Sequence, residues 1–417
     1  MKVHLKTFGC TANHADSRRI LGVVGGLGHT ICSEAEADAV IVNTCTVTGR
    51  TEQKVLGEIH RLIGIGMDVI VAGCIPAAQP EELADLDLCG TVTPRSFDRI
   101  GHLLPDHAGR GRERCSTDPV VPVGAVVAPV EIATGCVGNC SYCIVKKARG
   151  ELVSRPTEEI FEEVCELVKR GVWEIQLTSQ DTACYGWDIG SSLPGLLSEL
   201  SGIAGDFRIR VGMMNPATAR KILDELIEAY RCDKVYKFLH LPIQSGSDQV
   251  LIDMKRGHSA EEYRMISDKF TDNFPLGVVS TDFIVGYPTE TDTDFLRTLE
   301  LFRELQPFKV NITRYSKRPH TEASSLRDLP EWVKKERSRR LTEEHRRIAR
   351  EILHRYIGGV CEVAVTTTGR DHTSIARDDN YRYIVIKEKL ALGSRHKVKI
   401  RDAKSTYLIG ERVSRTV

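Results

Sequence analysis

The chain has 417 residues, of which 41% are hydrophobic and 27% are charged, a balance typical of a soluble globular protein. This composition excludes a disordered chain, and because no run of about 18 apolar residues is present, it also excludes a membrane-spanning helix. The 57 Lys and Arg balance the 57 Asp and Glu, which taken alone argues weakly against nucleic-acid binding. The start, MKVHLKTFGC, lacks an apolar stretch followed by small residues, so we expect no secretory signal and a cytoplasmic location.

Residues 1–103 alternate between strand and helix patterns. The predicted strands are VHLKTFG (3–9), ADAVIVN (37–43) and MDVIVAG (67–73), and the helical patterns HADSRRILGVV and GRTEQKVLGEIHRLI follow the first two. Such alternation predicts βαβ units in a parallel sheet, and therefore an α/β domain. Residues 104–128 contain several Pro and Gly and have no clear period, which predicts a linker.

Residues 129–330 continue the strand–helix theme with six predicted strands. Helical patterns such as TEEIFEEVCELVKR (157–170) and ATARKILDELIEAY (217–230) separate them. Six units predict a partial TIM-like barrel, a (β/α)6 arrangement whose chemistry lies on the loops after the strands. The strands are VEIAT (130–134), VWEIQLT (172–178), FRIRVGM (207–213), KVYKFLH (234–240), VVSTDFIVG (278–286) and KVNITRY (309–315).

The last part of the chain is basic. Residues 331–417 hold 21 Lys and Arg against 12 Asp and Glu, so the rest of the chain carries the opposite imbalance. Residues 331–357 predict a basic helical connector, and residues 358–417 predict a small β-barrel with strands VCEVAVTTT, YRYIVIKE, HKVKIRDAK and YLIGERVSR. The imbalance suggests an anion-binding module, although a solvated charged helix at 331–356 accounts for the composition equally well.

Three of the thirteen cysteines form a CxxxCxxC motif, Cys136, Cys140 and Cys143, in the loop after the first predicted barrel strand. Three thiolates on a short loop suit three corners of a 4Fe–4S cube and leave one iron without a protein ligand. A zinc site or buried thiols are the alternatives, but zinc usually takes a fourth ligand at fixed spacing, and none is evident nearby.

Cys10, Cys45 and Cys74 each follow the carboxyl end of a predicted strand, in TFGC, VNTCT and VAGC. The carboxyl ends of parallel strands share one edge of the sheet, where ligands bind. The pattern therefore predicts a second metal cluster, and three unrelated buried thiols are the alternative. We assign no role to the remaining seven cysteines.

The two triplets together resemble the radical S-adenosylmethionine (SAM) methylthiotransferases over nearly the whole chain. Within that family, the archaeal and eukaryotic branch that modifies N6-threonylcarbamoyladenosine in tRNA is the most similar. The tracts that carry the resemblance are TFGCTANHADS, VNTCTV, VAGCIPAAQP, LTSQDTACYGWDIG, HLPIQSGSDQVL and TDFIVGYPTETD. In YSKRPHTEAS, His320 stands where the family has Gly.

The resemblance implies an enzyme that inserts a methylthio group at carbon 2 of the adenine at tRNA position 37. It implies two 4Fe–4S clusters, a radical-generating one on Cys136, Cys140 and Cys143 and an auxiliary one on the N-terminal triplet. It also implies two uses of SAM, one as methyl donor and one as the source of a 5′-deoxyadenosyl radical. The implied SAM contacts are Tyr142, Ser179, Gln180, Asp181, Gln244, Ser245, Ile284 and Gly286.

The implied substrate base carries a carboxylate, so a cation should face it. Arg149, Arg155, Arg314, Lys317 and Arg318 are the candidates. The C-terminal barrel resembles a TRAM domain, which implies contact with the tRNA anticodon stem-loop. From Tyr381 to Val417 there are ten Lys and Arg against three Asp and Glu, and the candidates for phosphate contacts are His396, Lys397, Lys399, Arg401 and Lys404.

Two sister activities remain as alternatives, methylthiolation of isopentenyladenosine tRNA and of a ribosomal protein. A non-catalytic RNA-binding protein with structural iron or zinc is a third. We expect a monomer without membrane contact that receives electrons from a flavodoxin- or ferredoxin-type protein.

Overall fold

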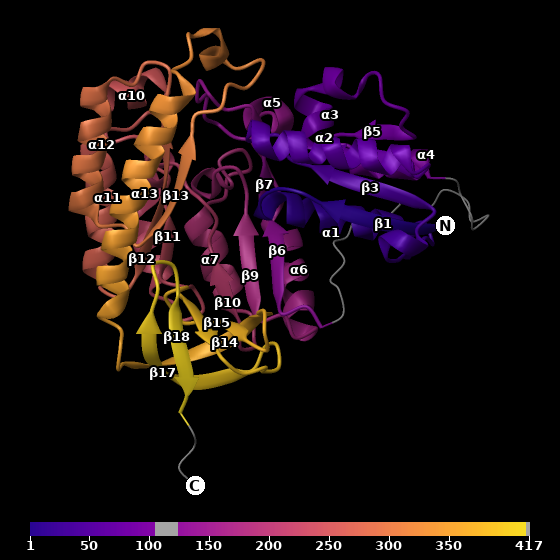
Figure 1. Cartoon of the computed structure of the whole chain (residues 1–417). Coiled ribbons are helices and arrows are strands. Elements are labelled where there is room, and N and C mark those ends of the chain that lie inside the picture. Colours follow the sequence, from indigo (N-terminus) through magenta and orange to yellow (C-terminus); the bar gives the residue numbers. More distant parts are fainter. Residues whose placement is uncertain (105–123, 414–417) are drawn as a thin grey trace.

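The computed structural model describes residues 1–104 and 124–413, which form three regions of regular structure (Figure 1). It confirms the predicted α/β fold class with parallel sheets, a partial barrel and a small closed β-barrel. The predicted linker 104–128 lies largely outside the described residues, although its last two residues, Val127 and Ala128, belong to a strand. No helix of the described residues has the length and apolar character needed to cross a membrane.

The N-terminal region is a five-stranded parallel sheet in the order β2-β1-β3-β4-β5. Its central strand, AVIVNT, is buried along its whole length, as expected of a strand that is covered on both faces. The strands are β1 (Lys2–Thr7), β2 (Thr30–Ile31), β3 (Ala39–Thr44), β4 (Asp68–Gly73) and β5 (Gly90–Val92); the helices are α1 (Thr11–Gly26), α2 (Gly49–Gly64), α3 (Cys74–Ala78) and α4 (Ile100–Leu103). Sequence reasoning missed β2 and β5, which are too short to show a period.

Six parallel strands form the half-barrel. They lie in two three-stranded sheets, and single bridges from Ile209 to Val235 and from Met213 to His240 join them into one curved series. In chain order the strands are β6 (Val127–Glu131), β9 (Glu174–Thr178), β10 (Arg208–Arg210), β11 (Phe238–His240), β12 (Val278–Val285) and β13 (Lys309–Arg314). Strands β10 and β11, in the middle of the series, are shorter than predicted. Each pairs regularly with its outer neighbour, but the two are connected to each other only by those single bridges.

Helices cover the outside of the half-barrel and bury a large apolar core against the strands. They are α6 (Thr157–Lys169), α7 (Leu193–Ser201), α8 (Pro216–Ala219), α9 (Leu223–Tyr230), α10 (Asp248–Asp253), α11 (Ala260–Asn273) and α12 (Asp292–Leu305). A short helix, α5 (Val145–Arg149), and a two-stranded hairpin, β7 (Ala133–Thr134) with β8 (Val153–Ser154), follow β6. They are built from the loop that carries the CxxxCxxC motif.

The basic segment is one long helix, α13 (Glu331–His354), which packs on β13 and leads into the closed C-terminal barrel. That barrel has the order β14-β15-β16-β18-β17, and all its pairings are antiparallel except β16 with β18. Its strands are β14 (Val360–Thr368), β15 (Ser374–Arg377), β16 (Tyr383–Ile386), β17 (Arg395–Ala403) and β18 (Leu408–Arg412). Sequence reasoning missed β15, a four-residue strand between two polar turns.

The C-terminal barrel lies at the amino ends of the half-barrel strands (Figure 1). Tyr381 donates a hydrogen bond to the buried Glu174 at the start of β9, with an oxygen–oxygen distance of 3.1 Å. Arg377 pairs with the same carboxylate at 3.1 Å and stacks 4.0 Å from the centre of the Tyr381 ring. The two regions are therefore joined through a buried, charged and aromatic contact.

This contact predicts the effect of removing one hydroxyl. Tyr381→Phe leaves the ring in place but removes a hydrogen bond to a buried carboxylate, so we expect a loss of about 1.5–3 kcal/mol in the free energy of unfolding. Urea titration followed by circular dichroism measures it. Tyr383→Phe is the control. The Tyr383 hydroxyl lies 3.5 Å from Arg377, at the limit of a hydrogen bond, so its removal should cost less free energy of unfolding. Equal losses for the two variants would contradict the assignment.

Candidate functional site

The CxxxCxxC loop lies beyond the carboxyl end of β6, where a partial barrel is expected to place its chemistry. The backbone N–H of Gly138 donates to the Cys136 sulfur at 3.3 Å, and a side chain at Gly138 would lie 3.4 Å from that sulfur and 4.0 Å from the sulfur of Cys140. The third thiol, Cys143, is linked to Cys140 by a backbone hydrogen bond of 3.0 Å. The loop therefore turns tightly and holds the three thiols around one space.

Buried polar side chains brace this loop against the far side of the half-barrel. Ser141 bonds to Asp253 O at 2.8 Å and to the Tyr287 hydroxyl at 2.9 Å. Arg256 donates to the Cys140 sulfur at 3.3 Å and to Pro242 O at 2.7 Å. Because Arg256 is itself buried, its charge faces the thiols rather than solvent.

The N-terminal triplet forms where three neighbouring strands end. Cys10, Cys45 and Cys74 follow β1, β3 and β4, which lie side by side in the sheet. Gly9 has a φ of 120°, and a side chain there would lie 2.7 Å from the Cys45 β-carbon, so the ends of β1 and β3 touch. Cys45 and Cys74 are buried and Cys10 is exposed, so one side of the triplet is open.

Two buried arginines from the half-barrel stand beside this triplet. Burial raises the pKa of Cys74 to about 12, and the charge of Arg149 opposes that shift. Burial also raises the pKa of Cys45, and Arg149 and Arg318 both act in the opposite direction. The arginines therefore favour the thiolate form that a metal ligand requires.

Both arginines are fixed by other partners. Arg149 binds Asp16 at 2.5 Å and lies 3.4 Å from Glu131, and all three side chains are nearly inaccessible to solvent. Burial alone would lower the pKa of Arg149, but the charges of Asp16, Cys74 and Glu131 raise it, so the guanidinium stays charged. Arg149 lies in the half-barrel and Asp16 on α1, so this pair also joins the two regions.

Arg318 makes a matching connection from the loop after β13. It donates to Thr46 at 2.8 Å and to Gln79 at 2.7 Å, and it pairs with Glu52. Thr46 follows Cys45 directly in the chain.

The two cysteine triplets belong to neighbouring helices. Cys74 begins α3, and α5 begins two residues after Cys143. The two helices pack together through a buried cluster that contains Cys74, Ala78, Ile144 and Ala148. The structure therefore brings together two thiol triplets that are far apart in the sequence.

All six cysteines are free thiols, as metal ligation requires. Within the described residues, no three His, Cys, Asp or Glu side chains are arranged to hold a single metal ion. A 4Fe–4S cube instead bonds each thiolate to a different iron, so it fits a more widely spaced triplet with no fourth ligand. The donor set at both triplets fits such a cluster.

The residues predicted after β9 are held by the protein itself. The Asp181 carboxylate accepts from Thr218 at 2.7 Å and from the backbone of Asn215 and Ala183. Gln180 accepts from the backbone of Gly135 at 2.6 Å, and Ser179 accepts from Asp181 N at 3.1 Å. These bonds fix the end of β9 beside the cysteine loop, and the contacts of these side chains with SAM remain a prediction.

The other predicted cofactor residues line the ends of β11 and β12. Gln244 has a φ of 81°, a strained value for a residue other than Gly, and its side-chain oxygen is buried without a partner. Ile284 donates its backbone N–H to Gln244 O at 2.9 Å. Ser245 is fully buried and accepts from Ser247 N, while Gly286 donates to Glu290 at 2.6 Å.

Tyr142 packs beside Cys140 and Arg256. A buried, unpartnered acceptor on strained backbone is typical of a binding site, which favours Gln244 in this set.

The predicted substrate cations divide into three groups. Arg149 and Arg318 are buried in the pairs described above, and their contact with a substrate carboxylate remains a prediction. Arg155 binds Glu163 at 2.7 Å, and Arg314 pairs with Glu331. Lys317 is exposed and has no ion pair within the described residues, so it is the most available of the five.

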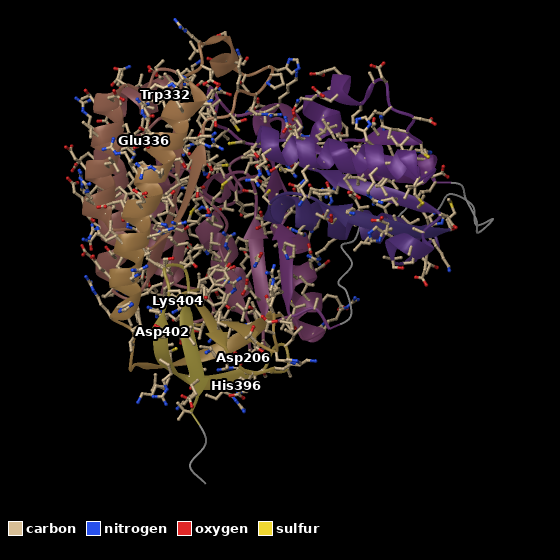
Figure 2. All side chains as sticks on the ribbon, in the orientation of Figure 1. Asp206, Trp332, Glu336, His396, Asp402 and Lys404 are labelled. Carbon is tan, nitrogen blue, oxygen red and sulfur yellow. The ribbon has the colours of Figure 1, made fainter. Side chains whose placement is uncertain are left out.

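The five predicted phosphate contacts lie on or directly beside β17, at the amino ends of the half-barrel strands (Figure 2). Lys397 lies near Glu362, Arg401 pairs with Glu411 at 2.6 Å and Lys404 pairs with Asp402 at 2.6 Å. The ring of His396 lies 2.9 Å from Ser394, and Lys399 has no ion pair within the described part of the chain. These cations are at the opposite end of the half-barrel from the cysteine loop.

Sequence reasoning missed Arg256, Asp16 and the pair of Glu290 with Arg337, whose atoms are 2.6 Å apart. None of them stands in a short motif with its partner, so their roles follow only from the folded arrangement. His320 takes a φ of 63°, the left-handed conformation that Gly favours, and binds Glu81 at 2.7 Å. The backbone thus keeps its shape despite the unusual residue.

Three family models match the chain. They are the Radical SAM superfamily over residues 130–302, the Uncharacterized protein family UPF0004 over residues 2–91 and the TRAM domain over residues 354–413. Together they cover the half-barrel, the N-terminal sheet and the C-terminal barrel.

Curated relatives match over the full length. A protein of Archaeoglobus fulgidus named a probable threonylcarbamoyladenosine tRNA methylthiotransferase is 41% identical over 99% of this chain and 98% of its own length. A Drosophila melanogaster protein named threonylcarbamoyladenosine tRNA methylthiotransferase is 33% identical over 98% of this chain and 77% of its own length.

Among solved structures, a radical S-adenosylmethionine methyltransferase, TsrM from Kitasatospora setae, has a TM-score of 0.55. The two proteins are 14% identical, and the match covers 78% of this chain and 76% of the TsrM chain. At that identity the likeness shows the fold alone.

The buried pair of Arg149 and Asp16 makes a prediction about stability and its pH dependence. Arg149→Met leaves the buried Asp16 carboxylate without its cation and removes one of the two arginines that bind the buried Glu131, so we expect a loss of about 3–5 kcal/mol in the free energy of unfolding at pH 7. Burial already raises the pKa of Glu131, and Arg149 limits that rise. Without Arg149, the folded protein takes up a proton more readily than the unfolded chain, so the loss should shrink as the pH falls from 7 to 5.

Urea titrations at the two pH values measure this effect. Arg19→Met is the control, because Arg19 binds the same Glu131 at 3.0 Å but is partly exposed. The assignment of the buried pair would be wrong if the free energy of unfolding lost in Arg149→Met did not change with pH. It would also be wrong if that loss were no larger than the loss in Arg19→Met.

Proposed function

This chain belongs to the threonylcarbamoyladenosine tRNA methylthiotransferase family, and from that membership we propose that it inserts a methylthio group at carbon 2 of N6-threonylcarbamoyladenosine at tRNA position 37. The product is 2-methylthio-N6-threonylcarbamoyladenosine. The observation that carries the proposal is the pairing of two free-cysteine triplets through the packing of α3 on α5. A binding protein with one structural metal would need only one of them.

The two clusters and SAM, when bound, supply the radical, the sulfur and the methyl group, which no side chain can provide at an unactivated aromatic C–H. Cys136, Cys140 and Cys143 would hold the cluster that binds SAM, and Cys10, Cys45 and Cys74 the auxiliary cluster. The exposed side of Cys10 leaves access to the auxiliary site. Arg256 places a fixed positive charge beside the first triplet, and Arg149 and Arg318 do the same for the second.

The remaining residues orient the ligands. Ser179, Gln180 and Asp181, at the end of β9 beside the cysteine loop, would contact SAM. The buried side-chain oxygen of Gln244, which has no hydrogen-bond partner, supports a contact there as well. Ser245, Ile284, Gly286 and Tyr142 complete that wall. Lys317 is the candidate for the threonylcarbamoyl carboxylate, since it is exposed near the end of β13 and carries no competing anion. Arg155 and Arg314 could serve only by exchanging their present partners.

The proposal includes a division of labour along the chain. Residues 1–103 hold the auxiliary cluster and residues 129–330 the radical chemistry; 104–128 link them. Residues 331–357 connect to the RNA-binding barrel at 358–417. We further propose that the protein acts as a cytoplasmic monomer, where tRNA is found, with electrons from a flavodoxin- or ferredoxin-type protein.

The cluster assignment predicts stepwise loss of metal. Changing Cys10, Cys45 and Cys74 together to Ala should remove about half of the iron and acid-labile sulfide and leave reductive cleavage of SAM to 5′-deoxyadenosine. Changing Cys136, Cys140 and Cys143 should remove the other half and abolish that cleavage. Iron analysis and chromatography measure both quantities. Cys165→Ala, on α6 and partly buried against the half-barrel core, is the control; an N-terminal triple variant with full iron would refute the auxiliary cluster.

The substrate assignment predicts a change in cellular tRNA. In cells that lack this gene, nucleoside mass spectrometry should show that 2-methylthio-N6-threonylcarbamoyladenosine disappears and that its unthiolated precursor accumulates. Restoring the gene should restore the product. Loss of a methylthio isopentenyl nucleoside, or an unchanged nucleoside profile, would instead support one of the sister activities.

A further inference from the structure

The fold separates the two surfaces that an RNA substrate must reach. The cysteine loop and Lys317 lie at the carboxyl ends of the half-barrel strands. The β17 cations lie at the amino ends, because the C-terminal barrel contacts the starts of β9, β10 and β11. An RNA that touches both must follow the outside of the protein from one end to the other.

Helix α13 connects these two ends. At its start Glu331 pairs with Arg314 at the end of β13, and Lys334 lies 3.4 Å from Tyr315 O. At its other end Leu353 enters the core of the C-terminal barrel, and Arg350 lies close to Lys404. With 24 residues the helix is about 36 Å long. Figure 2 shows Trp332 and Glu336 at one end of this path and Lys404 at the other.

One face of α13 is exposed and carries cations at helical spacing. Residues three, four or seven apart share a face of a helix. Glu336 and Glu343 lie on this exposed face with Arg339, and its aromatic and cationic members are Trp332, Lys335, Arg339, Arg346 and Arg350. The opposite side is buried against the half-barrel and the C-terminal barrel. We refer to these five residues as the α13 face.

The charges of the α13 face are only partly neutralised. Arg339 binds Glu336 at 2.8 Å and Glu343 at 2.7 Å. Lys335, Arg346 and Arg350 have no ion pair within residues 1–104 and 124–413. Trp332 is 72% exposed, the largest exposed fraction among the big hydrophobic residues of the described chain. Three cations of the α13 face thus have no ion pair within the described residues, and an exposed tryptophan stands at the end of the face nearer to Lys335.

We propose that the α13 face is a binding surface for the tRNA arm, with Lys335, Arg346 and Arg350 contacting backbone phosphates and Trp332 stacking on an unpaired base. The proposal rests on the proposed function and adds where the RNA lies. Phosphate contacts position a nucleic acid, and exposed aromatic rings bind unpaired bases by stacking. The tryptophan is at the end near Lys317, where an unpaired loop would be presented to the chemistry, and the row of cations leads to the C-terminal barrel.

An acidic protein partner is the competing occupant of a basic surface. The arrangement favours RNA, because unpaired cations near both ends of the helix match an extended polyanion better than a compact acidic patch. The α13 face is also continuous with the β17 cations of the region that matches the TRAM domain. A protein partner is therefore an outcome of the test rather than part of the proposal.

The test uses the full-length protein and its tRNA. Arg346→Gln with Arg350→Gln should weaken tRNA binding and reduce the slope of log affinity against log salt by about two, since each phosphate contact contributes about one. Lys169→Gln with Arg99→Gln is the matched control. It removes two exposed cations that have no ion pair within the described residues and lie on other surfaces. The control should leave both affinity and slope unchanged.

Trp332→Phe supplies a second readout. Wild-type tryptophan fluorescence should be quenched on tRNA binding, and part of that change should disappear in the variant; Trp173 is buried, and the exposed Trp187, in the loop after β9, would account for the remainder. Circular dichroism and iron content should match the wild type for every variant. Formation of 5′-deoxyadenosine without tRNA should also be unchanged.

The outcomes separate this proposal from the proposed function. If the wild type does not bind tRNA at all, the proposed function fails. If it binds tRNA but the α13 variants keep the wild-type affinity, salt slope and quenching, the α13 face is not the RNA surface. If those variants instead slow only reduction by an acidic flavodoxin, the face belongs to the electron donor and the RNA assignment is overturned.

Discussion

The arrangement of this protein depends on a buried ion pair between two regions. Arg149 belongs to the helix that follows the CxxxCxxC motif, and Asp16 to the helix that follows Cys10. Because both groups are buried and charged, neither region can move away without leaving an uncompensated charge in the interior. The pair therefore fixes the distance between the two triplets, and Arg318 makes the same kind of connection on the other side of the auxiliary site.

The two regions that this ion pair joins are both built on parallel sheets. Each sheet presents its loops at the carboxyl ends of its strands. Joined through α1 and β6, the two sheets direct those ends toward a shared space, with α3 against α5. The C-terminal barrel occupies the other end of the half-barrel and leaves this space to the ligands.

Sequence reasoning predicted the fold class correctly and singled out the two cysteine triplets, because both depend on local signals, and the structure brings the helices that follow these triplets together. The strand AVIVNT is apolar throughout, and the CxxxCxxC spacing is a property of one short loop. It did not foresee that Arg149 and Arg318 are buried in ion pairs, because their partners Asp16 and Glu52 are more than a hundred residues away in the chain. It also placed RNA-binding cations on the C-terminal barrel without showing that this barrel lies at the far end, because the packing of Tyr381 on Glu174 has no trace in either segment alone.

The contact of the C-terminal barrel with the half-barrel has a consequence for modularity. Phe238, Tyr236 and Lys309 are covered by Tyr381, Tyr383 and Arg377 from the barrel. Burial and the nearby charges of Arg377 and Arg210 together lower the pKa of Lys309 to about 7. A chain that ended before the barrel would expose an aromatic surface and hydrate this lysine. Although the barrel has its own core and its own family model, it thus behaves as a structural part of the enzyme, and evolution could exchange it only together with the residues beneath it.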